Sequence, residues 1–288
     1  MKKSLQIHWI IGLASLLPAF LHANTYTFTS AGATGREGPT QAQVDANYTG
    51  TSLEDAVTIN TQGIQEWSVP ADGNYSIEAW GAQGGASGGL GAKMFGHFSL
   101  LSGNSLKILV GQEGATLSST GGGGGGTFIV NGTIADGTLL VAAGGGGGAD
   151  RSNLSSEANG LIETTGGIAS YNNRYSNLPG SNGSASNSHN GAGHGGAGFL
   201  TDSHAGHGIL SFKNGGTGGS QSGHVDGGFG GGGTGDKSDG SYYGGGGGGG
   251  YSGGAGGAKT GGGAGGGGGG SYNSGTDQNN TAGANEGH

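Results

Sequence analysis

Residues 121–148 read GGGGGGTFIVNGTIADGTLLVAAGGGGG, and this stretch decides the fold. Two pure glycine runs, 121–126 and 144–148, enclose two apolar segments, 127–130 and 139–143. The apolar segments are rich in the β-branched and aromatic residues that are typical of strands. A flexible linker does not alternate polyglycine with buried-strand sequence. The glycines are therefore expected to belong to a folded structure.

The region before residue 121 is predicted to form short strands at 26–29, 63–69, 74–80, 93–100 and 105–110. Residues 74–80 alternate, with Tyr75, Ile77 and Ala79 on one face and Ser76, Glu78 and Trp80 on the other. The sequence Pro-Ala-Asp-Gly at 70–73 is a turn signal, and residues 102–104 predict a hairpin between the two segments beside them. The one weak helix candidate is 45–56.

Short strands without convincing helices predict an all-β fold, an antiparallel β-sandwich. Eight residues are predicted to hold structural positions in it: Trp67, Tyr75, Ile77, Trp80, Ile108, Val110, Phe128 and Val141. Half of any alternating set can face solvent.

Glycine accounts for 78 of the 288 residues, and further runs occur at 230–233, 244–250 and 265–270. Polyglycine can form extended left-handed helices with three residues per turn, and several such helices can bond to one another side by side. The alternative is a disordered Gly/Ser segment, since ordering glycine costs about 1–2 kcal/mol per residue. Aromatic residues recur beside the runs and could pack on the edges of a bundle: Phe229, Tyr242, Tyr243, Tyr251 and Tyr272. A bundle of polyglycine II helices, inserted into the sandwich, is therefore expected.

The N-terminus predicts export. Lys2 and Lys3 precede an apolar stretch at 7–21, and a cleavage site is expected before Asn24. The alternative is an uncleaved anchor, although the stretch is short for a membrane span. Cleavage removes two lysines, so the net charge changes from −8 to −8 − 2 = −10. An acidic chain with few cations is a poor nucleic-acid ligand, and a chain with no cysteine excludes disulfides and thiolate metal sites.

The predicted organisation has five parts. These are a signal peptide at 1–23, a lead-in with one strand at 24–54, the β-sandwich at 55–148, a Ser/Asn-rich surface excursion at 149–191, and the remaining strands with the polyglycine bundle at 192–288. Strand-like sequence is present in the last part at 208–212.

The sequence shows no catalytic set, and no cofactor or metal site is predicted. Asp226, Asp236 and Asp239 lie near glycines but without the spacing of a calcium repeat. Six histidines fall in the second half, at His189, His194, His204, His207, His224 and His288. His204 and His207 are three residues apart, but no acidic residue completes a zinc set, so these histidines are interpreted as polar surface or loop residues. Glu66 and Glu78 are better explained as solvent-facing strand residues than as a carboxylate pair.

Several whole phrases resemble a known domain: 65–85 (QEWSVPADGNYSIEAWGAQGG), 106–114 (LKILVGQEG), 121–130, 139–149 and 265–275. Together they resemble the glycine-rich extracellular domain of the anaplastic lymphoma kinase and leukocyte receptor tyrosine kinases, which secreted bacterial glycine-rich proteins share. The resemblance covers about residue 55 to the C-terminus. It implies a tumour-necrosis-factor-like sandwich and, in the receptors, binding of a protein cytokine. The kinase signature motifs are absent from this sequence.

The family usually continues past a sequence like Gly287-His288 into a last strand, which leaves two alternatives for this chain: the sandwich lacks a strand, or it accepts one from a partner. None of the receptors' cytokine-binding residues maps onto this sequence by motif. The position of a ligand site is therefore unknown, and residues 151–190 are the first candidate because long loops on rigid scaffolds often carry recognition. The alternative is a tolerated insertion.

The function expected from these observations is that of an exported, non-catalytic binding or adhesion protein that acts at or outside the cell surface on a protein or glycan. Two alternatives remain open at this point: a structural component of a surface layer or fibre, and a secreted hydrolase.

Overall fold

A computed structural model describes residues 24–151, 153–171, 175–187, 192–236, 243–258 and 263–285, so the predicted signal peptide at 1–23 lies outside the described residues. The fold is all-β, and its strand pairs are antiparallel, as the sequence predicts. The larger sheet has the order β1 (Val57–Thr61), β2 (Ile64–Ser68), β5 (Ser105–Leu109), β8 (Thr127–Asn131), β9 (Thr138–Ala143) and β14 (Tyr272–Asn273). The smaller sheet has the order β15 (Thr281–Asn285), β4 (Gly91–Leu100) and β3 (Gly73–Trp80).

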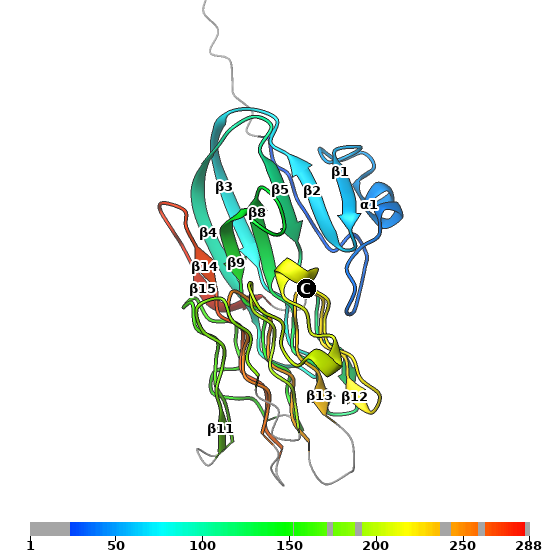
Figure 1. The fold of residues 1–288 in the computed structure, drawn as a ribbon, viewed down its shortest axis with the longest axis vertical. Helices are drawn as coiled ribbons and strands as arrows, with labels where there is room; N and C mark the ends of the chain where they lie inside the picture. Colours follow the sequence, from blue (N-terminus) through cyan, green and yellow to red (C-terminus); the bar gives the residue numbers. More distant parts are fainter. Residues whose placement is uncertain are drawn as a thin grey trace, which may run out of the picture.

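Three short two-stranded ladders complete the β-structure: β6 (Thr116–Leu117) with β7 (Thr120–Gly121), β10 (Ala169–Tyr171) with β11 (Tyr175–Asn177), and β12 (His224–Val225) with β13 (Gly235–Asp236). The molecule is elongated, with the two sheets at one end and a set of extended segments that continue from the strands at the other (Figure 1).

A hydrophobic core lies between the two sheets. Trp67, Ile108 and Val141 from the larger sheet meet Met94 and Phe98 from the smaller one, and all five are buried. We call this cluster the first core. Because one face of each sheet contributes to it, the two sheets form a β-sandwich.

The other face of the larger sheet is also covered. Phe128 of β8 packs against Phe199 and Phe212, with ring centroids 6.2 Å and 5.3 Å away, and all three are buried. Phe229 joins this second core. The covering segment contains two short 3-10 helices, η1 (Ala205–His207) and η2 (Phe212–Asn214). The near-continuous burial of β8 and β9 therefore results from cores on both faces.

The predicted strand at 208–212 is wrong. Gly208 and Gly215 have positive φ angles of 61° and 102° and end η1 and η2, so the chain turns repeatedly here. The apolar residues Ile209 and Phe212 are buried as loop anchors and not as strand positions.

The predicted hairpin at 93–110 is also wrong. Its two segments become β4 and β5, which belong to different sheets, and residues 101–104 carry the chain across the sandwich. The turn at 70–73 likewise links β2 of the larger sheet to β3 of the smaller one. Turn chemistry reverses the chain direction but does not decide whether the two strands pair or face each other across a core.

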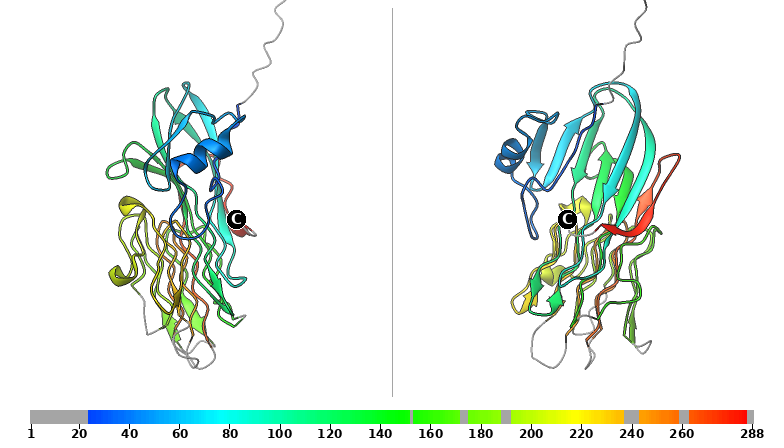
Figure 2. Two further views of the ribbon diagram at one scale, coloured as in Figure 1. Left: turned by 90° about the vertical axis from the view of Figure 1, so that its right-hand side faces the viewer. Right: turned by 180° about the vertical axis from the view of Figure 1, so that it is seen from behind.

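The strand predicted at 26–29 in the lead-in is wrong, and the regular element of the lead-in is a helix further along the chain. Helix α1 (Gln41–Tyr48) begins with a capping box between Thr40 and Gln43 and lies beside β1 (Figure 2). It starts four residues before the predicted helix candidate at 45–56. Residues 24–30 are extended without pairing in a sheet, and Tyr26 and Phe28 pack their rings on Trp67.

The glycine runs are ordered and buried. We call the runs 121–126, 144–148, 244–250 and 265–270, with the segments bonded to them, the glycine lattice. The backbone N–H groups of Gly124, Gly145 and Gly248 donate to carbonyls of other runs at 2.8–2.9 Å. These bonds satisfy backbone groups that burial would otherwise leave unpaired. A disordered Gly/Ser segment is excluded for these runs.

The neighbours of a run repeat every three residues. A Cβ added at residues 121 or 124 would meet the segment 82–85, at 122 or 125 the segment 226–230, and at 123 or 126 the run 244–250. The run 265–270 repeats in the same way. Three residues per turn is the period of polyglycine II. The assignment of these segments as polyglycine II helices and the tumour-necrosis-factor-like topology stay predictions.

The segment at 149–191, predicted as a surface excursion, has exposed residues but is also bonded into the glycine lattice. Gly167 donates to Gly268, Ala158 accepts from Gly147, and Ala158 and Ala169 are buried. Small residues there let the backbone enter the lattice, which composition alone did not reveal.

The eight predicted structural positions divide by burial. Trp67, Ile108, Phe128 and Val141 are buried. Tyr75, Ile77 and Val110 are partly buried against the first core. Trp80 is 37% exposed, on the solvent face that the alternation of β3 gives it.

Candidate binding groove

A groove of about 1070 Å³ lies where the lead-in passes the end of the smaller sheet. Its walls come from four segments: residues 28–30 and 33–35 of the lead-in, Trp80 at the end of β3, residues 110–116 after β5, and Asn285 of β15. Ligand sites are commonly concave, mostly apolar and equipped with a few polar groups. The groove has this composition, and we define it by these lining residues.

The indole of Trp80 is held in place at the groove by its strand neighbours. Its Nε1 donates to Glu78 Oε1 at 2.9 Å, and Lys93 Nζ lies 5.0 Å from the ring centroid. Lys93 also bonds Glu78 Oε2 at 2.8 Å. Burial alone would raise the pKa of Glu78, but the hydrogen bonds from Lys93 and Trp80 and the Lys93 charge lower it below its usual value. The carboxylate therefore stays ionised and orients the indole.

Gln112 is the most informative polar residue of the groove. It is 5% exposed, and neither its Nε2 nor its Oε1 has a hydrogen-bond partner among the described residues. Its backbone is fixed: the N–H donates to Phe229 O at 2.9 Å, and the C=O accepts from Gly125 N at 3.0 Å. A buried amide without partners costs about 1–3 kcal/mol, so such a group calls for an explanation. A ligand that supplies one acceptor and one donor would satisfy it.

The groove has little titratable chemistry. Among the described residues that line it, Glu113 is the only ionisable side chain, and it is exposed. General acid–base catalysis needs a positioned proton donor or acceptor at the reacting group, and two such groups are usual. The lining favours recognition through the aromatic ring and the amide.

The sequence did not single out this groove. The ligand site predicted at 151–190 contributes none of its lining residues and stays a prediction. Gln112 lies in the phrase LVGQEG, and the signal available was a polar residue between two glycines directly after an apolar strand. The convergence of Phe28 with Gln112 requires the tertiary structure, because 84 positions separate them.

The described acidic residues considered for calcium, Asp226 and Asp236, do not belong to a group of three or more potential metal ligands. Asp236 lies beside His224, with 3.9 Å between Asp236 Oδ1 and His224 Nδ1, and Asp239 lies outside the described residues. In the part of the chain that the structure describes, three or more potential metal ligands come together in one place, at His194, His204 and His207. The surface interpretation is wrong for His194 and His207, which are buried, while His204 is half-buried, and all three are neighbours.

Comparison with known proteins gives a partial match. No family model matches the chain. The chain is 41% identical over 99 residues to the leukocyte tyrosine kinase receptor of Mus musculus, a match that covers 31% of this chain and 11% of the receptor. The chain therefore spans a small part of that receptor's length. The match is consistent with the predicted relationship to a receptor extracellular domain, and a relationship to bacterial glycine-rich proteins stays a prediction. Over about a third of its length, the chain is similar to part of a receptor tyrosine kinase.

Proposed function

We propose that this protein is an exported, non-catalytic binding or adhesion protein and that its ligand, a protein segment or glycan at a cell surface, occupies the groove around Gln112 and Trp80. The similarity to part of a receptor supports a surface role. The signal-like N-terminus supports export. None of the helices among the described residues has the length and apolar character needed to cross a membrane.

The observation that carries the proposal is the buried, unbonded amide of Gln112 in the groove. A carboxamide presents a donor and an acceptor side by side, which suits a peptide group or a pair of sugar hydroxyls. The exposed Trp80 ring adds a flat apolar surface of the kind that stacks on a sugar face or an aromatic side chain.

An open sheet edge supports a second candidate function, assembly into a surface layer or fibre. The eight-residue strand β3 ends the smaller sheet and pairs on one side, with β4. A long unpaired edge is a template for a strand of another chain. Growth of the light-scattering signal with protein concentration, abolished by a Tyr75→Pro substitution in β3, would favour assembly over the groove proposal.

The test uses the mature chain from Asn24, probed against arrays of surface glycans and host-surface proteins. Two groove variants, Trp80→Ala and Gln112→Met, are expected to weaken binding to a hit by about tenfold or more, since losing a buried polar partner costs about 1–3 kcal/mol, truncating an aromatic anchor costs about as much, and about 1.4 kcal/mol is tenfold. The matched control is Leu101→Ala, which removes a side chain that is 62% exposed on a turn outside the groove lining. Circular dichroism verifies that each variant is folded. Arrays without a hit, or hits that both groove variants bind as tightly as the control, would contradict the proposal.

A further inference from the structure

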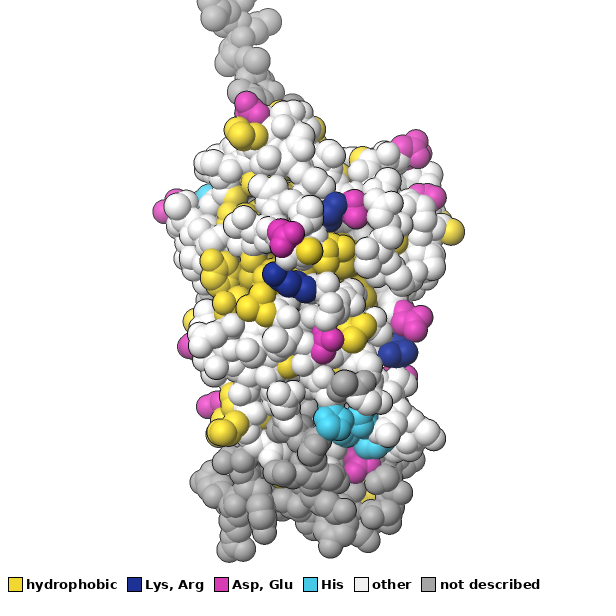
Figure 3. Space-filling view, in the orientation of Figure 1, with side chains coloured by type: hydrophobic (Ala, Val, Ile, Leu, Met, Phe, Trp, Pro, Cys, Tyr) yellow, Lys and Arg dark blue, Asp and Glu magenta, His cyan; other side chains and the backbone are white. Residues whose placement is uncertain are grey.

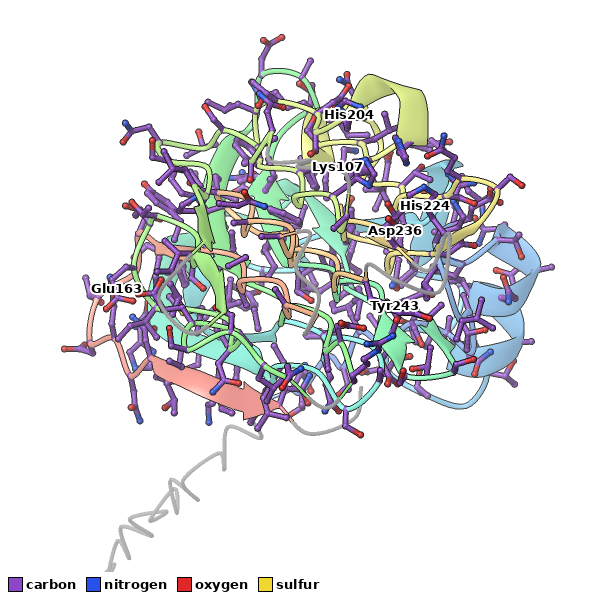
Figure 4. All side chains as sticks on the ribbon, turned by 90° about the horizontal axis from the view of Figure 1, so that it is seen from below. Lys107, Glu163, His204, His224, Asp236 and Tyr243 are labelled. Atoms are coloured by element: carbon purple, nitrogen blue, oxygen red, sulfur yellow. The ribbon has the colours of Figure 1, made fainter. Side chains whose placement is uncertain are left out.

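Four histidines from three separate segments gather on one side of the glycine lattice. The ring centroid of His194 lies 3.7 Å from that of His207, 5.1 Å from that of His204 and 5.3 Å from that of His224. A group of histidine side chains is visible on the surface of the lower half of the molecule (Figure 3). His204 and His224, with Asp236 below them, are labelled in the view from the lattice end (Figure 4). We call these four residues the histidine cluster.

The glycine lattice itself positions His194. Its backbone N–H donates to Thr234 O at 2.8 Å, and its C=O accepts from Gly247 N at 2.9 Å. Its side chain is buried, and Nδ1 lies 2.8 Å from Thr234 Oγ1. When Nδ1 carries the proton and donates to this hydroxyl, Nε2 keeps its lone pair. A histidine that binds a metal through one ring nitrogen commonly donates a hydrogen bond from the other in this way.

The other members are brought in by short, local structures. His204 precedes η1 and His207 is its last residue, and the backbone N–H of His207 donates to His204 O at 3.0 Å. His224 lies on β12, opposite Asp236 of β13. Asp236 Oδ1 lies 3.9 Å from His224 Nδ1, which is longer than a hydrogen bond, and His224 Nδ1 has no hydrogen-bond partner among the described residues.

We infer that the histidine cluster is a site for a late first-row transition ion such as Zn²⁺, Cu²⁺ or Ni²⁺. Ligand atoms of His194, His204 and His207 all lie within 4.8 Å of one another. Imidazoles bound to zinc at about 2.0–2.1 Å lie about 3.3 Å apart around a tetrahedral ion, so small side-chain rotations close the site. His224, or a water, supplies the fourth ligand. Neutral nitrogen donors select these ions over Ca²⁺ and Mg²⁺, which prefer oxygen.

The ion would have a structural effect at this place. It would connect the lattice segment of His194 to the loop that contains η1 and to β12. A structural metal that binds the folded chain stabilises it in proportion to its affinity. This inference does not depend on the binding function proposed for the groove, because the two sites share no residue.

The experiment uses the mature chain without a histidine tag, stripped with a chelator and dialysed against Zn²⁺ at pH 7.5. The expected result is one equivalent of zinc by mass spectrometry, saturable binding in calorimetry, and the visible spectrum of a tetrahedral site when Co²⁺ replaces zinc. His204→Asn, at a half-exposed position, is expected to weaken binding by at least tenfold, which is the lower range seen when a supporting residue of a metal site is lost. The buried His207→Asn is a second variant, accepted if its circular dichroism matches that of the parent.

The matched control is His97→Asn. His97 lies on β4 in the sandwich, where its Nδ1 is 2.9 Å from Ser76 Oγ, and it should leave zinc binding unchanged. The inference is overturned if the chain binds none of Zn²⁺, Cu²⁺ and Ni²⁺ saturably. It is also overturned if His204→Asn and His97→Asn bind zinc equally, which would indicate binding elsewhere on the chain.

Discussion

A single methyl group added inside the glycine lattice should destabilise the protein strongly. In Gly145→Ala the new Cβ would stand 2.4 Å from Gly124 O and 2.6 Å from Gly125 O. Ordinary contacts of this kind are about 3.5 Å, so the run 121–126 would have to retreat by about 1 Å. The retreat would strain the 2.8 Å bonds from Gly124 N to Gly146 O and from Gly145 N to Gly249 O.

The magnitude follows from the groups that lose their partners. Two buried backbone groups left unbonded cost about 1–3 kcal/mol each. Alanine also restricts the unfolded chain, which recovers about 0.4–1 kcal/mol. The net loss in the free energy of unfolding is therefore about 3 kcal/mol, a large part of the roughly 5–15 kcal/mol that a domain has.

The assay is urea unfolding of the mature chain, followed by the emission of the buried Trp67. The matched control is Gly206→Ala, since an added Cβ there meets no atom within 4 Å and the residue is exposed. The control should stay within about 1 kcal/mol of the parent. Alanine at Gly144 and at Gly146 should cost as much as at Gly145, because the three positions face three different segments. A loss below about 1 kcal/mol at Gly145, or tolerance at alternate positions as on a half-exposed strand, would refute the lattice packing.

Two further substitutions test the electrostatics. Burial raises the pKa of Asp150 above its usual value, against the opposing effects of the Thr120 hydrogen bond and the Arg151 charge. A carboxyl whose pKa is higher in the folded chain than in the unfolded chain binds protons more readily in the folded chain. The free energy of unfolding therefore falls as the pH rises from the unfolded-state pKa to the folded-state pKa. Asp150→Asn should therefore raise the free energy of unfolding at pH 7, and this advantage should disappear below pH 4. Urea unfolding at both pH values measures the difference. An equal effect at the two pH values would contradict the reasoning. Glu66 and Lys107 are opposite residues of β2 and β5, joined at 2.6 Å with side chains only 17% and 12% exposed. Glu66→Gln should cost about 1–3 kcal/mol, between the values for surface and buried pairs, and adding Lys107→Met should restore part of it in thermal unfolding; full additivity of the two would show that the pair does not interact.

The sequence predicted local structure where one residue pattern had one physical outcome. The alternation around Tyr75 and Ile77 placed β3 and its buried face, and the apolar segments between the first glycine runs became β8 and β9. It failed where the outcome depended on a distant partner. The turns at 70–73 and 101–104 could reverse the chain either within one sheet or between two sheets. Packing in the first core decides that both turns connect the two sheets.

The candidate sites depend on distant partners even more strongly. Gln112 is a candidate binding residue only because the tertiary structure brings Phe28 and Trp80 into the same groove. His194 meets His204 and His207 because Thr234 and the lattice hold its backbone. The three-residue spacing of His204 and His207 was the one signal in the sequence, and nothing in the spacing predicted that His194 and His224 join them.

The three-residue repeat of the glycine lattice has a consequence for how the chain finds its native alignment. A glycine run that slides along its neighbours by three residues makes nearly the same bonds as before, because no side chain distinguishes one position from the next. The information that selects one alignment must come from the ends of the runs. The run 121–126 leads into β8, and the run 144–148 follows β9, which pairs with β8. The run 265–270 leads towards β14, which also pairs with β9. The strands of the sandwich thus fix the alignment of the glycine runs. Insertions or deletions within a run are expected to be tolerated in multiples of three when the flanking strands are intact.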